Sequence, residues 1–149
     1  MSETRIDVSG MDELVQTMES VARKYPDKTG DFIRKEAYKT RSRVVREMKS
    51  AVDVNESNRA SLGRSGNYSV SQSKGYGAGQ YVELSAKSPH FHLIERGHNL
   101  VDRRTRDPVG KGWVQGYLVI DAAARESKAQ MPYDAQQFID QFMGEEGLL

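Results

Sequence analysis

The segment Ser88-Pro89-His90-Phe91-His92-Leu93-Ile94-Glu95-Arg96-Gly97-His98 decides how the rest of this chain is organised. It is short, it is apolar at three positions, and it contains every histidine of the sequence. Proline is favoured in the first turn of a helix and glycine at the residue after the last turn. The pattern therefore predicts a short helix from Pro89 to Arg96, with Gly97 as its left-handed cap, packed as a corner of the core.

The three histidines together with Glu95 are the only candidate metal cluster in the sequence. On a strand, His90 and His92 would share a face, but on a helix they point about 200° apart and cannot bind one ion. The His-Glu-x-x-His spacing of zinc proteases is absent. We expect hydrogen-bonded histidines in a packed corner, with no metal and no cofactor; a metal-dependent enzyme built on these histidines is the less favoured alternative.

Composition narrows the possible functions. A chain of 149 residues, 37% of them apolar, predicts one domain with one modest core. The absence of cysteine excludes disulfides, thiol catalysis and cysteine metal sites. A formal charge of +1 gives no reason to expect the whole chain to bind nucleic acid or membrane. Neither a Gly-x-Ser-x-Gly elbow nor a nucleotide fingerprint occurs, so we expect no enzyme and no catalytic residue.

Upstream of the central segment the pattern is helical. A short strand is expected at Arg5–Val8, then a helix from Met11 to Lys24 that Pro26 ends, because proline disfavours helical geometry in the residue before it. Its apolar residues share one face: Met11, Leu14, Val15, Met18, Val21 and Ala22. A longer helix follows from Asp27 to Val52, with its own apolar stripe at Ile33, Ala37, Thr40, Val44, Met48 and Ala51.

The long helix is rich in basic residues. Ten basic and four acidic residues lie between Arg23 and Lys49. We expect four of the basic residues on the side opposite the apolar stripe, namely Lys35, Lys39, Arg46 and Lys49. This surface is either a solvated helix face or a surface that meets DNA phosphates or an acidic partner.

Between the helices and the central segment, Tyr68–Ser71 and Gln80–Ala86 alternate in polarity and predict an antiparallel hairpin with a glycine-rich loop. Downstream, residues 99–115 predict a loop or hairpin arm that turns at Gly110-Lys111-Gly112. We expect this arm to contact a partner through Arg103, Arg104, Arg106, Lys111 and the lone Trp113.

Two further helices are expected at the C-terminal end, Gly116–Ala129 and Tyr133–Met143, separated by Pro132. The last one combines an apolar side with four acidic residues (Asp134, Asp140, Glu145 and Glu146), which suits docking on a basic neighbour. Its expected contact residues are Phe138, Ile139, Phe142 and Met143. The fold class is therefore α+β: a small antiparallel sheet packed by a long helix, with a core domain at 1–130 and a C-terminal docking helix and tail at 131–149.

The order of these elements resembles the tail-completion or head–tail joining proteins of long-tailed bacteriophages, a family of gene-ten-like minor structural proteins. Ile94-Glu95-Arg96-Gly97 matches the family segment that ends in hydrophobic-hydrophobic-Glu-x-Gly. Gly116-Tyr117-Leu118-Val119-Ile120-Asp121-Ala122 matches the family's last core helix in shape, without its two prolines, and Ala60–Ser65 is a loose echo of its Thr-Gly-x-Leu. The resemblance covers residues 5 to 127.

The resemblance implies a non-enzymatic virion protein at the neck or tail top, assembled in the bacterial host cytoplasm. It implies a homo-oligomeric ring, generally of six copies, that joins the head-closure or connector ring to the tail tube or tail terminator, with passing contact to genomic DNA and none to a membrane. Pro89, Glu95 and Gly97 would be structural, with Glu95 holding the loop after Gly97 or pairing with an arginine. The alternatives are a nucleic-acid-binding module that uses the basic helix face and a tail terminator ring.

Overall fold

The computed structural model describes residues 9–52, 61–102, 104–106 and 108–149; the strand expected at Arg5–Val8 lies outside these ranges. Two long helices dominate the fold: α1 (Ser9–Ala51) and α3 (Val119–Glu145). Between them lie two hairpins and one short helix: β1 (Tyr68–Val70), β2 (Leu84–Ala86), α2 (Phe91–Arg96), β3 (Gly97–Val101) and β4 (Pro108–Gln115). The α+β class expected from the sequence is confirmed.

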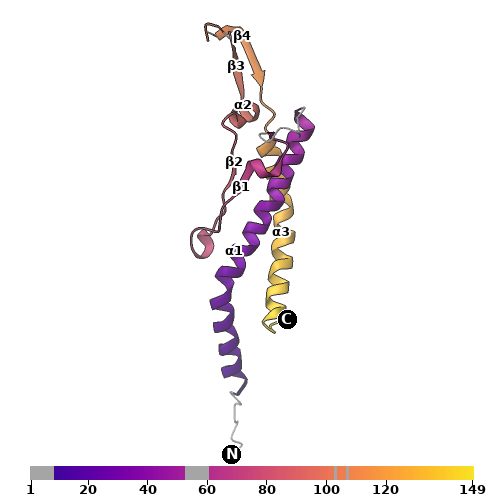
Figure 1. Ribbon diagram of the computed structural model, residues 1–149. Coiled ribbons are helices and arrows are strands. Elements are labelled where there is room, and N and C mark those ends of the chain that lie inside the picture. Colours follow the sequence, from indigo (N-terminus) through magenta and orange to yellow (C-terminus); the bar gives the residue numbers. More distant parts are fainter. Residues whose placement is uncertain (1–8, 53–60, 103, 107) are drawn as a thin grey trace, which may run out of the picture.

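The two long helices run antiparallel (Figure 1): Lys24, in the first half of α1, pairs with Glu146 just after α3, whereas Arg43, in the last part of α1, pairs with Glu126 near the start of α3. The small core lies where the C-terminal end of α1 meets α2 and the start of α3. Its buried members come from α1, the segment after it, β1, α2 and α3: Val44, Met48, Leu62, Tyr68, Phe91, Val119 and Ala123. Part of the apolar stripe expected on the second helix therefore forms this core.

Both prolines expected to end a helix lie inside one, so the division into four helices is wrong. Pro26 deletes one N–H donor from α1, but its own carbonyl accepts a hydrogen bond from Gln80 Nε2 at 3.0 Å. Ion pairs from Lys24 and Lys28 to the end of α3 hold the helix on both sides of the proline. Packing against α3 thus outweighs the local preference of the residue before proline. The same continuity through Pro132 leaves no helix boundary at 130.

The hairpin expected at Tyr68–Ala86 is confirmed: β1 and β2 pair antiparallel, with Ser69 opposite Ser85. It lies alongside α1 (Figure 1), where Gly30 approaches Ser73 so closely that an added Cβ would lie 3.1 Å from the Ser73 hydroxyl. The first hairpin is therefore held by its own chain.

The second hairpin, β3–β4, confirms the expected arm but corrects its turn. The strands pair from Gly97 opposite Gln115 to Val101 opposite Pro108, so the turn lies between Val101 and Pro108. The expected turn at 110–112 lies inside β4 instead. Position 112 has no room for a side chain, because the Leu100 side chain covers Gly112: an added Cβ would lie 2.8 Å from Leu100 Cδ1.

The central segment folds as expected, into a short helix that ends at glycine. Gly97 has a φ of +85°, and an added Cβ would lie 2.3 Å from the Val114 carbonyl oxygen, so only glycine fits there. Pro89 precedes the helix and is exposed. The residues after β4 then provide donors for the last carbonyl groups of α2, which have no partner within the helix. The Tyr117 N–H donates to the Ile94 carbonyl, and the Leu118 N–H donates to the Glu95 carbonyl.

Because residues 116–118 close α2, the last helix begins at Val119 and not at Gly116 as expected. Leu118 has left-handed backbone geometry and no side chain that can cap the helix. Glu95 takes that role: its buried carboxylate accepts the Ile120 N–H, at 3.2 Å through Oε1 and 3.1 Å through Oε2. Helix N-termini favour negative charge, so Glu95 fixes α3 onto α2. Glu95 is structural, but its partner is neither the loop after Gly97 nor an arginine.

Candidate functional site

The acidic residues of the C-terminal helix meet basic residues of the same chain. Lys24 pairs with Glu146 at 2.8 Å, Lys28 with Glu145 at 3.2 Å, and Lys39 with Asp134 at 2.9 Å. The Lys39 ammonium lowers the pKa of Asp134, and the Lys24 ammonium lowers that of Glu146. In the structure α1 of the same chain supplies basic partners for this helix, and docking on another molecule stays a prediction.

An aromatic seam accompanies these ion pairs. Phe32 of α1 stacks on Phe138 of α3 with ring centroids 4.7 Å apart, and Tyr25 lies 6.0 Å from Phe142. Two of the contact residues expected on the last helix, Phe138 and Phe142, therefore serve the fold. Ile139 is exposed and Met143 is half-buried.

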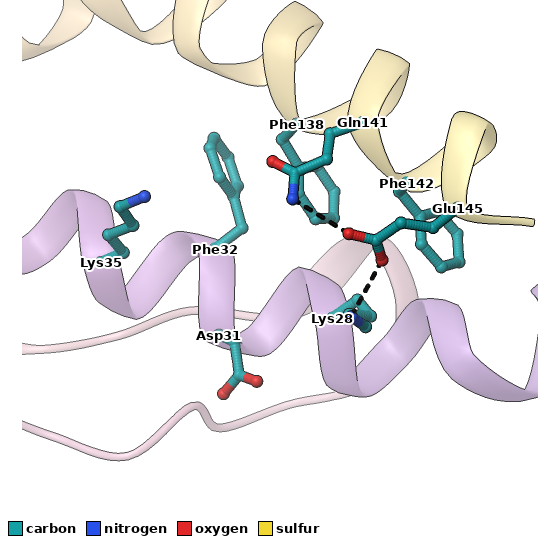
Figure 2. A pocket seen from close by; sticks show the side chains of 8 residues that line it. All are labelled: Lys28, Asp31, Phe32, Lys35, Phe138, Gln141, Phe142 and Glu145. Atoms are coloured by element: carbon teal, nitrogen blue, oxygen red, sulfur yellow. Dashed lines mark hydrogen bonds and ion pairs between the residues drawn. The ribbon is translucent and has the colours of Figure 1, made fainter.

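A hollow of about 240 Å³ opens beside this seam (Figure 2). Lys28 and Gln141 both donate to the Glu145 carboxylate and close one end of it, whereas Asp31 points away from α3. Pockets for small molecules usually measure about 300–1,000 Å³. This hollow is smaller and open, and we interpret it as a seam of helix packing.

Two of the four residues of the basic face expected on α1 pair with acidic residues of the same chain. Lys39 pairs with Glu36 and Asp134, and Arg46 pairs with Glu126 and Glu47. These partners raise the pKa of both basic groups, above all through the hydrogen bonds that Lys39 donates to Glu36 and Arg46 donates to Glu126. Lys35 and Lys49 are exposed. Part of the positive charge of this helix thus faces acidic residues of α3, and contact of the basic face with DNA or an acidic partner stays a prediction.

The β3–β4 hairpin (Gly97–Gln115), named here the arm, projects from the core beyond the C-terminal end of α1 (Figure 1). Trp113 on this arm is 54% exposed, and Leu100 and Val101 are exposed as well. Arg104 and Arg106 are exposed at its turn. Arg103 and the side chain of Lys111 lie outside the described residues. Among the described contact residues of the arm, Arg104, Arg106 and Trp113 are therefore exposed to solvent.

The turn of the arm is organised by Asp102. Its Oδ1 accepts the N–H of Arg104 at 2.6 Å and of Thr105 at 3.1 Å, and these bonds, that from Thr105 first, lower the pKa of Asp102. Backbone donors hold this carboxylate, and the Arg104 and Arg106 side chains beside it are exposed.

A second exposed surface lies on the N-terminal part of α1, at the other end of the molecule (Figure 1). Four residues on one side of the helix form it, and we name it the α1 stripe: Met11, Leu14, Val15 and Met18, which are 58%, 45%, 49% and 59% exposed. The sequence predicted that these residues share one face of the helix, without assigning that face a partner. Heptad spacing of Met11, Met18, Tyr25 and Phe32 was the signal that it continues the contact line to α3.

The histidines do not form a shared site. His90 and His92 are exposed, and His98 is half-buried with its Nδ1 unpaired. Within residues 9–52, 61–102, 104–106 and 108–149, no group of three or more His, Asp or Glu side chains is placed to hold a metal ion.

Comparison of the chain with protein-family models, with curated proteins and with solved structures finds no match. In the described part of the chain, no helix has both the length and the apolarity needed to cross a bilayer. The candidate functional surfaces are therefore the arm and the α1 stripe, two partly apolar faces at opposite ends of an elongated molecule.

Proposed function

We propose that this protein is a non-enzymatic virion structural protein of a long-tailed bacteriophage, a tail-completion or head–tail joining component that works as a ring between the head-closure ring and the tail tube. Its activity would consist of contacts with copies of itself and with those two partners. The order of elements resembles that of the joining family, and this resemblance is the reason for proposing a role in the virion.

One observation supports a role in an assembly most strongly. The chain exposes 11362 Å² of accessible surface at a mass of 16.8 kDa. A compact monomer of this mass exposes about 7,700 Å². The excess comes with apolar side chains: eight apolar residues are buried, whereas eighteen large ones are exposed among the described residues. Surface of this extent and character is typical of a subunit whose neighbours complete its burial.

The distribution of the exposed apolar residues also supports a joining role. A joining protein must offer separate surfaces to its neighbours, and here the arm and the α1 stripe lie at opposite ends of the molecule (Figure 1). The 43 residues of α1 alone span about 64 Å, so the two surfaces cannot compete for one partner.

The experiment that tests this function is deletion of the gene from the phage or prophage that carries it, followed by electron microscopy of the lysate. We expect filled heads and finished tails that stay separate, and joining restored by the wild-type gene supplied in trans. Joined, infectious particles in the absence of the protein would overturn the proposal. Native mass spectrometry of the purified chain, with about six copies expected, gives the ring size.

A further inference from the structure

The α1 stripe lies beyond the reach of α3. The last ion pair between the helices joins Lys24 to Glu146, and the Ser20 hydroxyl donates to the same carboxylate. Residues of α1 before Ser20 extend past the end of α3 (Figure 1). Met11 and Met18 nevertheless fall on the line that continues, at seven-residue steps, to Tyr25 and Phe32, which do contact α3. The helix thus presents the same contact line in both parts, and only one part is covered.

The charge around the α1 stripe indicates what covers it. Asp12, Glu13 and Glu19 are the only charged residues between Met11 and Ala22, which gives this part of the helix a formal charge of −3. None of the three has an ion-pair partner among the described residues. Asp12 and Glu19 flank the stripe, about 100° and 80° from Met11 around the helix, so a second copy of the same stripe would bring four carboxylates together, and like charges repel. The stripe therefore favours a basic apolar partner over itself.

The arm has those properties. Over residues 97–115 it carries Arg103, Arg104, Arg106 and Lys111 against Asp102 and Asp107, a formal charge of +2. Its exposed Trp113 is the residue type most often found as an anchor in protein interfaces. Trp113 covers Gly97 within the hairpin, where an added Cβ would lie 2.9 Å from Trp113 Cζ2. This contact holds the indole on one face of the arm, ready for docking.

We propose that the arm of one copy docks, through Trp113, on the α1 stripe of a second copy of this chain. The two surfaces lie at opposite ends of one molecule (Figure 1), so the contact joins different copies. We take the contact to be heterologous, so that each copy gives its arm to one neighbour and its stripe to another; a wild-type chain that stops at a dimer would instead show a reciprocal antiparallel pair and would overturn this part of the proposal. Contacts of this kind close into rings or continue as filaments, and they do not stop at a dimer. The inference needs self-association only and does not rest on the virion function.

The test uses two variants of the full chain, and each variant carries a substitution that prevents binding by one of the two surfaces. Trp113→Glu destroys the arm and leaves the α1 stripe, whereas Met18→Glu destroys the stripe and leaves the arm. We expect sedimentation velocity to show assemblies larger than a dimer for the wild type and a monomer for each variant alone. Mixed in equal amounts, the two variants are expected to form a 1:1 dimer, because the intact arm of one meets the intact stripe of the other.

Each other outcome excludes the proposal in a recognisable way. A wild-type chain that stays monomeric at hundreds of micromolar excludes self-association. Dimers of Trp113→Glu alone show stripe-to-stripe pairing, and two variants that remain monomeric when mixed, with wild-type circular dichroism spectra, show that stripe and arm do not meet. These results leave the joining function open, since that depends on the deletion phenotype.

The absence of native cysteine allows a direct map of the contact. Asn99 lies opposite Trp113 in the hairpin and is exposed, so Asn99→Cys labels the docking face without removing the indole. Ala22→Cys labels the continuation of the α1 stripe, about 20° from Met11 around the helix at 100° per residue. A mixture of the two is expected to give a dimer with a short bismaleimide. Gln16→Cys, about 140° from Met11, is the matched control and is expected to give at least tenfold less product.

Discussion

The two parts of α1 carry similar apolar periodicity and have different fates. From Lys24 onward the helix is covered by α3, and Lys24, Lys28 and Lys39 pair with acidic residues of that helix. Before Ser20 the helix is uncovered, and its charged residues are acidic. Apolar spacing shows that a helix has a face to bury, but the charges that flank the face decide which element can bury it. The same helix therefore serves the fold in one part and, by our proposal, an interface in the other.

The largest difference is expected between two methionines of this helix. Met48 is fully buried and Met18 is exposed. Met48→Ala leaves a cavity in the small core and is expected to lower the free energy of unfolding by about 2–5 kcal/mol. Met18→Ala is expected to change it by less than about 0.5 kcal/mol, measured by urea denaturation at concentrations where the chain is monomeric. Equal losses at the two positions would mean that the α1 stripe is buried within its own chain.

A smaller effect is expected at the residue that fixes α3 onto α2. Glu95→Ala removes the acceptor for the Ile120 N–H and is expected to lower the free energy of unfolding by about 1–2 kcal/mol. Glu95→Gln keeps one acceptor oxygen and is expected to lose less. Glu19→Ala, on the uncovered part of α1, is the matched control without a structural partner in the described residues. A Glu95→Ala chain as stable as this control would contradict the capping role.

The next largest change in the free energy of unfolding is expected from the buried hydroxyl of Tyr68. It donates to the Leu62 carbonyl at 2.9 Å, so Tyr68→Phe is expected to cost about 1 kcal/mol, whereas Tyr76→Phe, at an exposed position, is expected to cost nothing measurable. Burial, and then the charge of Glu95, raises the pKa of Tyr68 to about 12. The neutral form is thus the stable one in the fold. Its stabilising effect is present below pH 10 and lost as the pH rises through about 12, which ultraviolet titration alongside unfolding measures.

The smallest effect concerns the ion pairs that distinguish the covered part of α1. The Lys39 ammonium lowers the pKa of Asp134 from its ordinary 3.8, so this pair stabilises the fold above pH 3.8 and is lost as the pH falls through the depressed value. Asp134→Asn is expected to reduce the loss of unfolding free energy between pH 5 and pH 2.5. Asp12→Asn is the control from the uncovered part. A wild-type acid profile in Asp134→Asn would show that this pair adds no stability.

Much of the fold could be predicted because the signals are local. The glycine after Arg96, the alternation from Tyr68 to Ala86 and the hairpin arm each depend on a few neighbouring residues. The structure places the first two as expected, and it forms the arm with its turn between Val101 and Pro108 instead of at 110–112. The breaks at Pro26 and Pro132 were wrong because a proline costs one hydrogen bond, whereas contact with the other long helix extends over both sides of it.

The sequence by itself determined which faces of this protein are apolar and where its charges lie, since periodicity and composition are properties of the chain. Only the tertiary structure decided how those faces are used. It set Lys39 and Arg46 against acidic residues of α3, placed Phe142 in the helix seam, and left the α1 stripe in solvent. The physical reason is length: α1 is 43 residues long and α3 is 27, so in an antiparallel pair the shorter helix cannot cover the longer one.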